Sequence, residues 1–181
     1  MRISRFAVIL ALVLSRPSRF LHSQTSTGHE QQKAVPSTEL QLTIGDNATT
    51  ITQAELATLP QKSVTVHNPH TNKNETYTGV ALGDLLAKHG FAMGQATHRT
   101  MLRSYITAEG TDRYWVLYSV AEIEPSEHAA EVIVATSIDG HALGEDGQLK
   151  LVASADKKPQ RWVRNLSAIR LVTVAQASVA R

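Results

Sequence analysis

The 181-residue sequence contains no cysteine. A chain without cysteine forms no disulfide, and it offers no thiolate to zinc, copper or an iron–sulfur cluster. Its fold must therefore be held together by a hydrophobic core alone. The hydrophobic content of 42% and the chain length fit one globular domain that is large enough to bury such a core.

Long apolar runs are also missing. The unbroken apolar segment Phe6–Leu14 (FAVILALVL) has nine residues, whereas a helix that crosses a bilayer needs about 20. Two arginines precede this segment, and a basic start before a short apolar run is typical of a secretory signal peptide. We therefore predict a signal peptide over residues 1–23, cleaved after Ser15 or Ser23, and an exported protein that is periplasmic or extracellular. No transmembrane span is expected.

Positive charge is scarce once this leader is set aside. The formal net charge of the whole chain is +2, but four of its 18 basic residues lie within residues 1–23, which contain no acidic residue. The rest of the chain has 14 basic residues against 16 acidic ones. Nucleic-acid binding requires a basic surface on the folded domain, so we expect no nucleic-acid partner.

Residues 24–38 (QTSTGHEQQKAVPST) are polar and predict a flexible linker. Beyond them, residues 39–176 are predicted to form one β-rich, mixed α+β domain of about eight strands and two or three short helices. Capping-box patterns begin at Thr52 and Ser119, and Gly90 ends a helical pattern. Alternating or buried-type apolar runs predict strands at 40–44, 63–67, 75–78, 101–107, 113–118, 131–137, 149–153 and 167–174.

Several motifs occur in an order that resembles a known family. They are YTGVALGDLLAKHG (77–90), YSVAEIEP (118–125) and EVIVATSIDGHALGEDGQLKLVASADKKPQRWVRNLSAIRLV (131–172). Together they are similar to the molybdopterin-binding domain of the sulfite oxidase family, over roughly residues 76–174. The resemblance implies that fold, a molybdopterin cofactor and an oxidoreductase ancestry. The most similar members would be small exported proteins.

The chain departs from the family's pattern at the position that holds the metal. In the family, a cysteine before the Tyr-Thr-Gly element supplies a thiolate to molybdenum, and residues 63–79 contain none. Lys150 also stands where arginine is frequent, and Ala153 where proline is usual. We therefore predict a degenerate binding module or partner subunit without its own redox chemistry. The alternatives are a molybdopterin-dependent oxidoreductase and a purely structural or interaction protein.

The loop between the last two predicted strands is basic and contains the second tryptophan. The resemblance implies that Arg161 and Trp162 lie near the pterin, and we expect Lys157 and Lys158 at the rim of the same pocket. A guanidinium can hold an anionic group bidentately and an indole can flank a planar ring, so the expected ligand is a planar anionic small molecule. We assign no catalytic residue and no metal ligand.

A structural alternative exists for the same two residues. Trp162 can simply close the bottom of the sheet, with Arg161 paired to Glu145 or Asp146. Charge is indeed segregated here, because residues 120–147 hold seven acidic residues and no lysine or arginine, whereas residues 148–170 hold six basic residues and one acid. Such blocks predict either faces that pair with each other or an anion site on the basic side.

Overall fold

The computed structural model describes residues 35–124 and 130–175, all within one compact unit, Gln31–Arg181. The predicted signal peptide and most of the predicted linker lie outside the described residues, and residues 35–38 form neither helix nor strand. Within the described part, no helix has the length and hydrophobicity that crossing a membrane requires.

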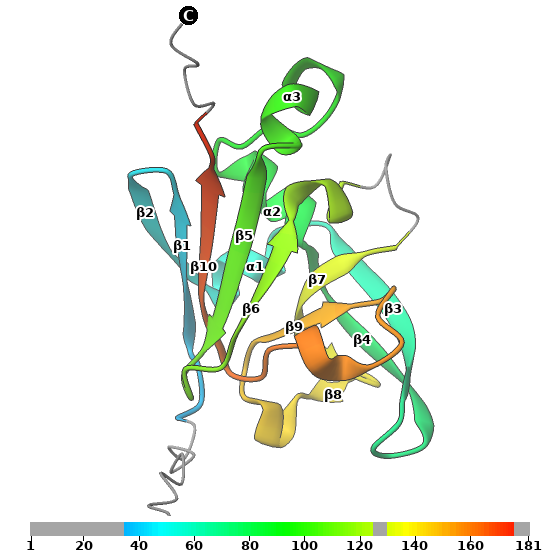
Figure 1. Cartoon of the computed structure of the whole chain (residues 1–181). Coiled ribbons are helices and arrows are strands. Elements are labelled where there is room, and N and C mark those ends of the chain that lie inside the picture. Colours follow the sequence, from blue (N-terminus) through cyan, green and yellow to red (C-terminus); the bar gives the residue numbers. More distant parts are fainter. Residues whose placement is uncertain (1–34, 125–129, 176–181) are drawn as a thin grey trace, which may run out of the picture. The chain divides into compact units, whose positions relative to one another are not determined.

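The first of two five-stranded sheets has the strand order β2-β1-β10-β5-β6 (Figure 1). The neighbouring strands β1 and β10 are parallel, and the other neighbouring strands of this sheet are antiparallel. The strands are β1 (Glu39–Ile44), β2 (Asn47–Thr52), β5 (Ser104–Gly110), β6 (Trp115–Ser119) and β10 (Leu166–Thr173).

The second sheet is antiparallel, with the order β3-β4-β7-β8, and β9 pairs with β7. Its strands are β3 (Gln61–Asn68), β4 (Lys73–Ala81), β7 (Val132–Ile138), β8 (His141–Ala142) and β9 (Lys150–Ala153). The register between β4 and β7 shifts between Thr78 and Gly79, which brings the backbones of the two strands very close at Gly79.

Helices are short, and two of the predicted caps are confirmed. The hydroxyl of Thr52 accepts from the N–H of Glu55, and Ser119 and Glu122 form a complete capping box. The α-helices are α1 (Gln53–Ala57), α2 (Leu82–Lys88) and α3 (His98–Met101). The 3₁₀ turns are η1 (Gln95–Thr97), η2 (Val120–Glu122), η3 (Gly144–Asp146) and η4 (Pro159–Arg161).

Two features of the first sheet differ from the sequence prediction. Strand β2 (NATTIT) was not predicted, because Ile51 is its only buried residue and its polar threonines give no apolar alternation. The strand predicted from residue 101 begins instead at Ser104, since Met101 is buried as part of helix α3. Apolar residues occur both at the end of α3 and in β5, so the hydrophobic pattern alone does not show where the helix ends and the strand begins.

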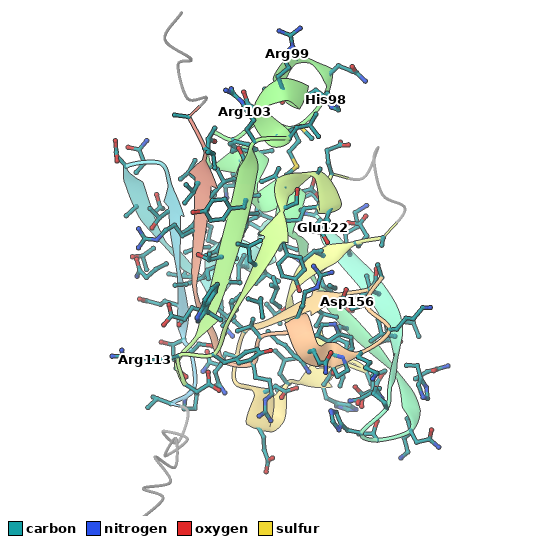
Figure 2. All side chains as sticks on the ribbon, viewed as in Figure 1. His98, Arg99, Arg103, Arg113, Glu122 and Asp156 are labelled. Atoms are coloured by element: carbon teal, nitrogen blue, oxygen red, sulfur yellow. The ribbon has the colours of Figure 1, made fainter. Side chains whose placement is uncertain are left out.

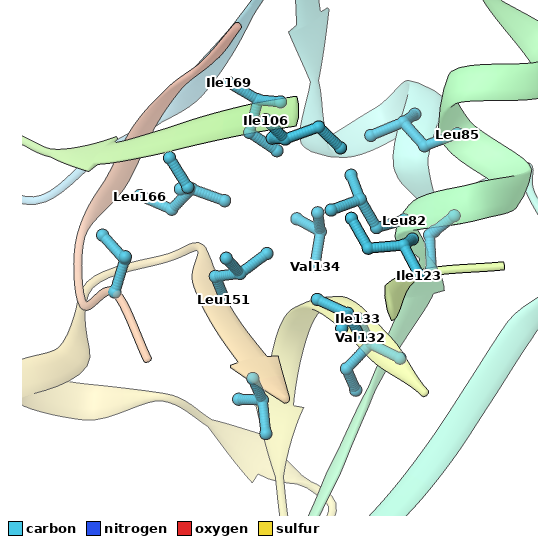
Figure 3. Packing of buried hydrophobic residues seen from close by; sticks show 14 of the residues in the cluster. Leu82, Leu85, Ile106, Ile123, Val132, Ile133, Val134, Leu151, Leu166 and Ile169 are labelled. Carbon is cyan, nitrogen blue, oxygen red and sulfur yellow. The ribbon is translucent and has the colours of Figure 1, made fainter. Parts of the chain in front are cut away.

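The hydrophobic core lies between the two sheets. Figure 3 shows Ile106 and Ile169 of the first sheet on one side of the core, Val134 and Leu151 of the second sheet on the other, and Leu82 of α2 beside them. All five side chains are fully buried. Two sheets with a few short helices make a β-rich, mixed α+β fold.

Candidate functional site

A cleft of about 720 Å³ opens where five segments meet: the β3–β4 hairpin, the β5–β6 turn, η3, the start of β9 and the η4 loop. The hydroxyl of Tyr114, in the β5–β6 turn, donates to the carbonyl of Gln160 and so ties two walls of the cleft together. Three cations, two acids and two aromatic residues line the cleft: Arg113, Lys150, Arg164, Asp112, Asp146, Tyr114 and Trp162.

Lys150 is the buried cation at the floor of this cleft. It is only 5% exposed, although it is the first residue of β9. Its Nζ donates to Asp146 Oδ2 at 2.6 Å and to the hydroxyl of Tyr77 at 2.9 Å, and it lies 4.6 Å from the centre of the Tyr77 ring. A buried ammonium needs such partners, because an unpaired charge away from water is strongly disfavoured.

Tyr77 connects Lys150 to a second buried charge. Its hydroxyl donates to Glu75 Oε2 at 2.8 Å while it accepts from Lys150. Burial and the hydrogen bond to Glu75 raise the pKa of Tyr77 well above its ordinary value, so the phenol keeps its proton. Glu75 also accepts from the side chains of Asn68 and Thr71, which lie at the end of the β3–β4 hairpin. A continuous chain of hydrogen bonds therefore joins this hairpin to the floor of the cleft.

This chain predicts a specific pH dependence of stability. Burial tends to raise the pKa of Glu75, but hydrogen bonds from Asn68, Thr71 and Tyr77, with the charge of Lys150, outweigh it and hold the pKa below the ordinary 4.5. A carboxyl with a lowered folded-state pKa stabilises the fold above its unfolded pKa, and this contribution is lost as the pH falls through the folded value. Below about pH 4.5, the free energy of unfolding of the wild type should therefore fall more steeply than that of Glu75→Gln. Urea denaturation of both proteins between pH 7 and 3 measures this, and parallel curves would contradict it.

Trp162 lines the cleft and also closes the sheet. Only 5% of it is exposed, and its Nε1 donates to the carbonyl of Ala153 at 3.1 Å. Its ring meets that of Tyr77 edge-on, with centroids 5.7 Å apart, and lies 5.4 Å from Lys150 Nζ. Trp162 is thus a buried residue of the sheet that also lines the cleft, and its role in ligand binding stays a prediction.

Arg161 points away from the cleft. Its Nε and Nη2 donate to the two carboxylate oxygens of Asp156, at 3.1 and 2.6 Å, and its Nη1 donates to Glu122 at 2.9 Å. Its guanidinium also lies 4.5 Å above the ring of Tyr118. Arg161 is therefore paired with acidic residues, as the structural alternative expected, but these are Asp156 and Glu122 rather than Glu145 or Asp146.

The adjacent residues Arg161 and Trp162 of the η4 loop thus lie at two different cavities. Arg161 is the last residue of the 3₁₀ turn η4, whereas the backbone at Trp162 is extended, so the backbone conformation changes between the two residues. Arg161 lines a separate cavity of about 80 Å³. Figure 2 shows its partners Glu122 and Asp156 on a different part of the fold from Arg113, which marks the β5–β6 turn beside the cleft.

The remaining basic residues of the loop also differ in position, because some are exposed to solvent outside the cleft and one lines it. Lys157 and Lys158 are exposed, and neither is among the residues that line the cleft in the described structure. Arg164 does line it, with its side chain 62% exposed and its Nε 3.8 Å from Asp146 Oδ1. The predicted pairing between the acidic and basic blocks is confirmed by the ion pairs Lys150–Asp146, Arg161–Glu122 and Arg164–Asp146.

Sequence reasoning missed the centre of the site. Glu75 and Tyr77 are two residues apart on β4, so both side chains lie on one face of the strand. Lys150 is the only charged residue of a strand whose four residues are all buried. A lysine in such an apolar run was a usable signal, because lysine is almost never fully buried unless it is paired.

The two histidines of the hairpin do not come together with acidic ligands. His67 Nδ1 lies 3.3 Å from Asn74 Oδ1, and the backbone N–H of His70 donates to Asn68. In the described part of the chain, no group of three or more histidine, cysteine, aspartate or glutamate residues is placed to hold a metal ion.

The pairing of Arg161 predicts a loss of stability when the residue is truncated. Each ion pair of a side chain that is 38% exposed contributes at most about 1 kcal/mol, and the contact with Tyr118 adds a similar amount. Arg161→Ala should therefore lower the free energy of unfolding by about 1–2 kcal/mol, whereas Lys158→Ala in the same loop should change it by less than about 0.5 kcal/mol. Urea denaturation tests both. If Arg161→Ala leaves the free energy of unfolding unchanged but weakens ligand binding, Arg161 has the binding role that the sequence predicts.

The comparisons with known proteins bear on the fold. No match was found among family models or among curated proteins. Among solved structures, the chain is similar to the sulfane dehydrogenase SoxCD from Paracoccus pantotrophus, with a TM-score of 0.56 and 18% sequence identity. The likeness covers 74% of this chain and 37% of that one. It supports a distant sulfite oxidase-like fold.

Proposed function

We propose that this protein is a binding module for a small, planar, anionic molecule and has no redox chemistry of its own. The observation that carries the proposal is the cleft, where buried Lys150 lies beside Trp162 and two arginines stand at the sides. Cationic donors next to aromatic surface suit an anion attached to a flat ring. If the predicted signal peptide directs export, the ligand is met in the periplasm or outside the cell.

The residues present do not fit a molybdenum centre of the kind that the resemblance implies. The sequence has no cysteine to supply a thiolate. The segment where the family carries that cysteine, residues 63–79, is here the β3–β4 hairpin, and Glu75 holds its end in place. The proposed function therefore includes no redox step, and the likeness to a sulfane dehydrogenase supports the fold alone.

Isothermal titration calorimetry with 2-naphthoate as the planar anion tests the proposed function. The wild type should bind, and Arg164→Ala should bind about tenfold more weakly, the lower end of the loss expected for one charge-assisted hydrogen bond, because Arg164 is exposed. Arg170→Ala is the matched control, since Arg170 is an exposed arginine of β10 that does not line the cleft. Binding that is equally weakened in both variants would indicate a non-specific charge effect. If the wild type binds no planar anion, the proposed function is wrong and the structural or interaction role is favoured.

The oxidoreductase alternative has its own measurement. Molybdenum analysis of protein purified from its native host should be negative for a binding module without redox chemistry. Stoichiometric molybdenum would overturn the proposal in favour of the enzyme.

A further inference from the structure

We infer that the ligand is an aromatic monocarboxylate, bound through its carboxylate to Lys150, and that the cleft selects it over a phosphate ester of the same ring. This inference rests on the proposed function and names its ligand class. Four features of the site support it: the remaining N–H donor of Lys150, the way Tyr77 orients that donor, the charge around it, and the apolar surface beside it.

The ammonium of Lys150 has one donor left for a ligand. An ammonium group has three N–H donors, and two of those of Lys150 donate to Asp146 and Tyr77, at 2.6 and 2.9 Å. The tetrahedral geometry of the nitrogen fixes the direction of the third once two are held. Because Lys150 lines the cleft while being only 5% exposed, a ligand reaches this ammonium from the cleft.

Tyr77 is the positioning residue for this donor. Its own proton is committed to Glu75, so its oxygen presents a lone pair to Lys150. Glu75 is in turn held by Asn68 and Thr71. The ammonium is thus preorganised before a ligand arrives, and the binding free energy is not spent on orienting a flexible lysine.

The local charge favours a single negative charge on the ligand. The cleft is lined by three cations, Lys150, Arg113 and Arg164, and by two acids, Asp112 and Asp146. With His70 counted as neutral, their formal charges sum to one net positive charge. Asp146 stays 2.6 Å from Lys150 Nζ, so any anion on the ammonium also lies close to this carboxylate. A carboxylate ligand neutralises the net charge of the cleft, whereas a dianionic phosphate leaves an excess of negative charge there. The cost of desolvating an ion rises with the square of its charge, while its attraction to the cations rises only in proportion to the charge.

The ring of the ligand has apolar surface to pack against. Trp162, Tyr114 and Pro159 line the same cleft as Lys150. An aromatic ring placed on them buries apolar area, while its carboxylate extends to the floor.

Three ligands that share one ring test the inference by calorimetry on the full chain: 2-naphthoate, 2-naphthyl phosphate and 2-naphthamide. The wild type should bind the naphthoate at least about tenfold more tightly than either of the others, a difference that corresponds to about 1.4 kcal/mol. In Lys150→Met, which keeps the length of the side chain without its charge, the preference for naphthoate over naphthamide should disappear. In Tyr77→Phe, the preference for naphthoate over naphthamide should shrink severalfold, because the ring remains and only the orienting hydroxyl is lost.

The outcomes separate this inference from the proposed function. If the phosphate binds as tightly as the naphthoate, or if Lys150→Met keeps the preference, the carboxylate inference is wrong while a planar-anion site remains. If none of the three ligands binds, the proposed function fails and the inference with it. Should Lys150→Met fail to fold, the ligand preference of the wild type and that of Tyr77→Phe test the inference instead. An unchanged preference in Tyr77→Phe would contradict the positioning role of Tyr77.

Discussion

Gly79→Ala should destabilise the protein by at least about 3 kcal/mol, as expected when a new atom meets backbone that cannot move aside. A Cβ at residue 79 would lie 2.1 Å from the carbonyl oxygen of Val134 and 2.6 Å from the Cα of Ala135. Both atoms belong to the backbone of β7, which is hydrogen-bonded to β4 at this point. Relief therefore requires the two central strands of the second sheet to separate. Thermal and urea denaturation followed by circular dichroism measure the loss.

Gly45→Ala is the matched control. Gly45 has a φ of +59°, but no atom lies within 4 Å of a Cβ built there. Its replacement costs only the left-handed backbone conformation, about 1–2 kcal/mol. If Gly79→Ala costs no more than Gly45→Ala, the close approach of β4 to β7 is contradicted, and with it the physical reason for a glycine after Tyr77 and Thr78.

Trp162→Ala should cost about 3–5 kcal/mol, the range for removing a large aromatic side chain from a core. The indole is 5% exposed, donates to the carbonyl of Ala153 and packs edge-on against Tyr77. Its removal leaves a cavity beside the Lys150 ammonium and frees that carbonyl acceptor. We expect the variant to lose ligand binding as well as stability, because the same ring lines the cleft. Urea denaturation gives the first effect and calorimetry with 2-naphthoate the second.

The other tryptophan of the chain provides the control for this variant. Trp115 lies on β6 and is 60% exposed. Trp115→Ala should change the free energy of unfolding by less than about 1 kcal/mol, since little apolar area is buried there. Similar losses for the two tryptophans would mean that Trp162 is not the core residue that its contacts indicate.

Local signals in the sequence determined much of the fold. The caps at Thr52 and Ser119 follow from side chains that bond backbone N–H groups two or three residues away. Four strands of the second sheet, β3, β4, β7 and β9, follow from alternation and from apolar runs bounded by turns, whereas the two-residue strand β8 was not predicted. The opposite blocks of charge around residue 147 predicted either pairing of acidic and basic residues or an anion site, and the ion pairs Lys150–Asp146, Arg161–Glu122 and Arg164–Asp146 are present. Each of these signals depends only on neighbours along the chain, so no knowledge of the tertiary structure was needed to recognise it.

Only the tertiary structure decided which residues form the site. Tyr77 and Lys150 are 73 positions apart, and they meet because β7 pairs with β4 on one side and with β9 on the other. The end of the 3₁₀ turn η4 then separates Trp162, which lines the cleft, from Arg161, which pairs with Asp156 and Glu122. The sequence shows that a basic loop with a tryptophan exists, but not which of its side chains face the cleft. That depends on strand pairing and on the direction of single side chains, which no local pattern in the chain records.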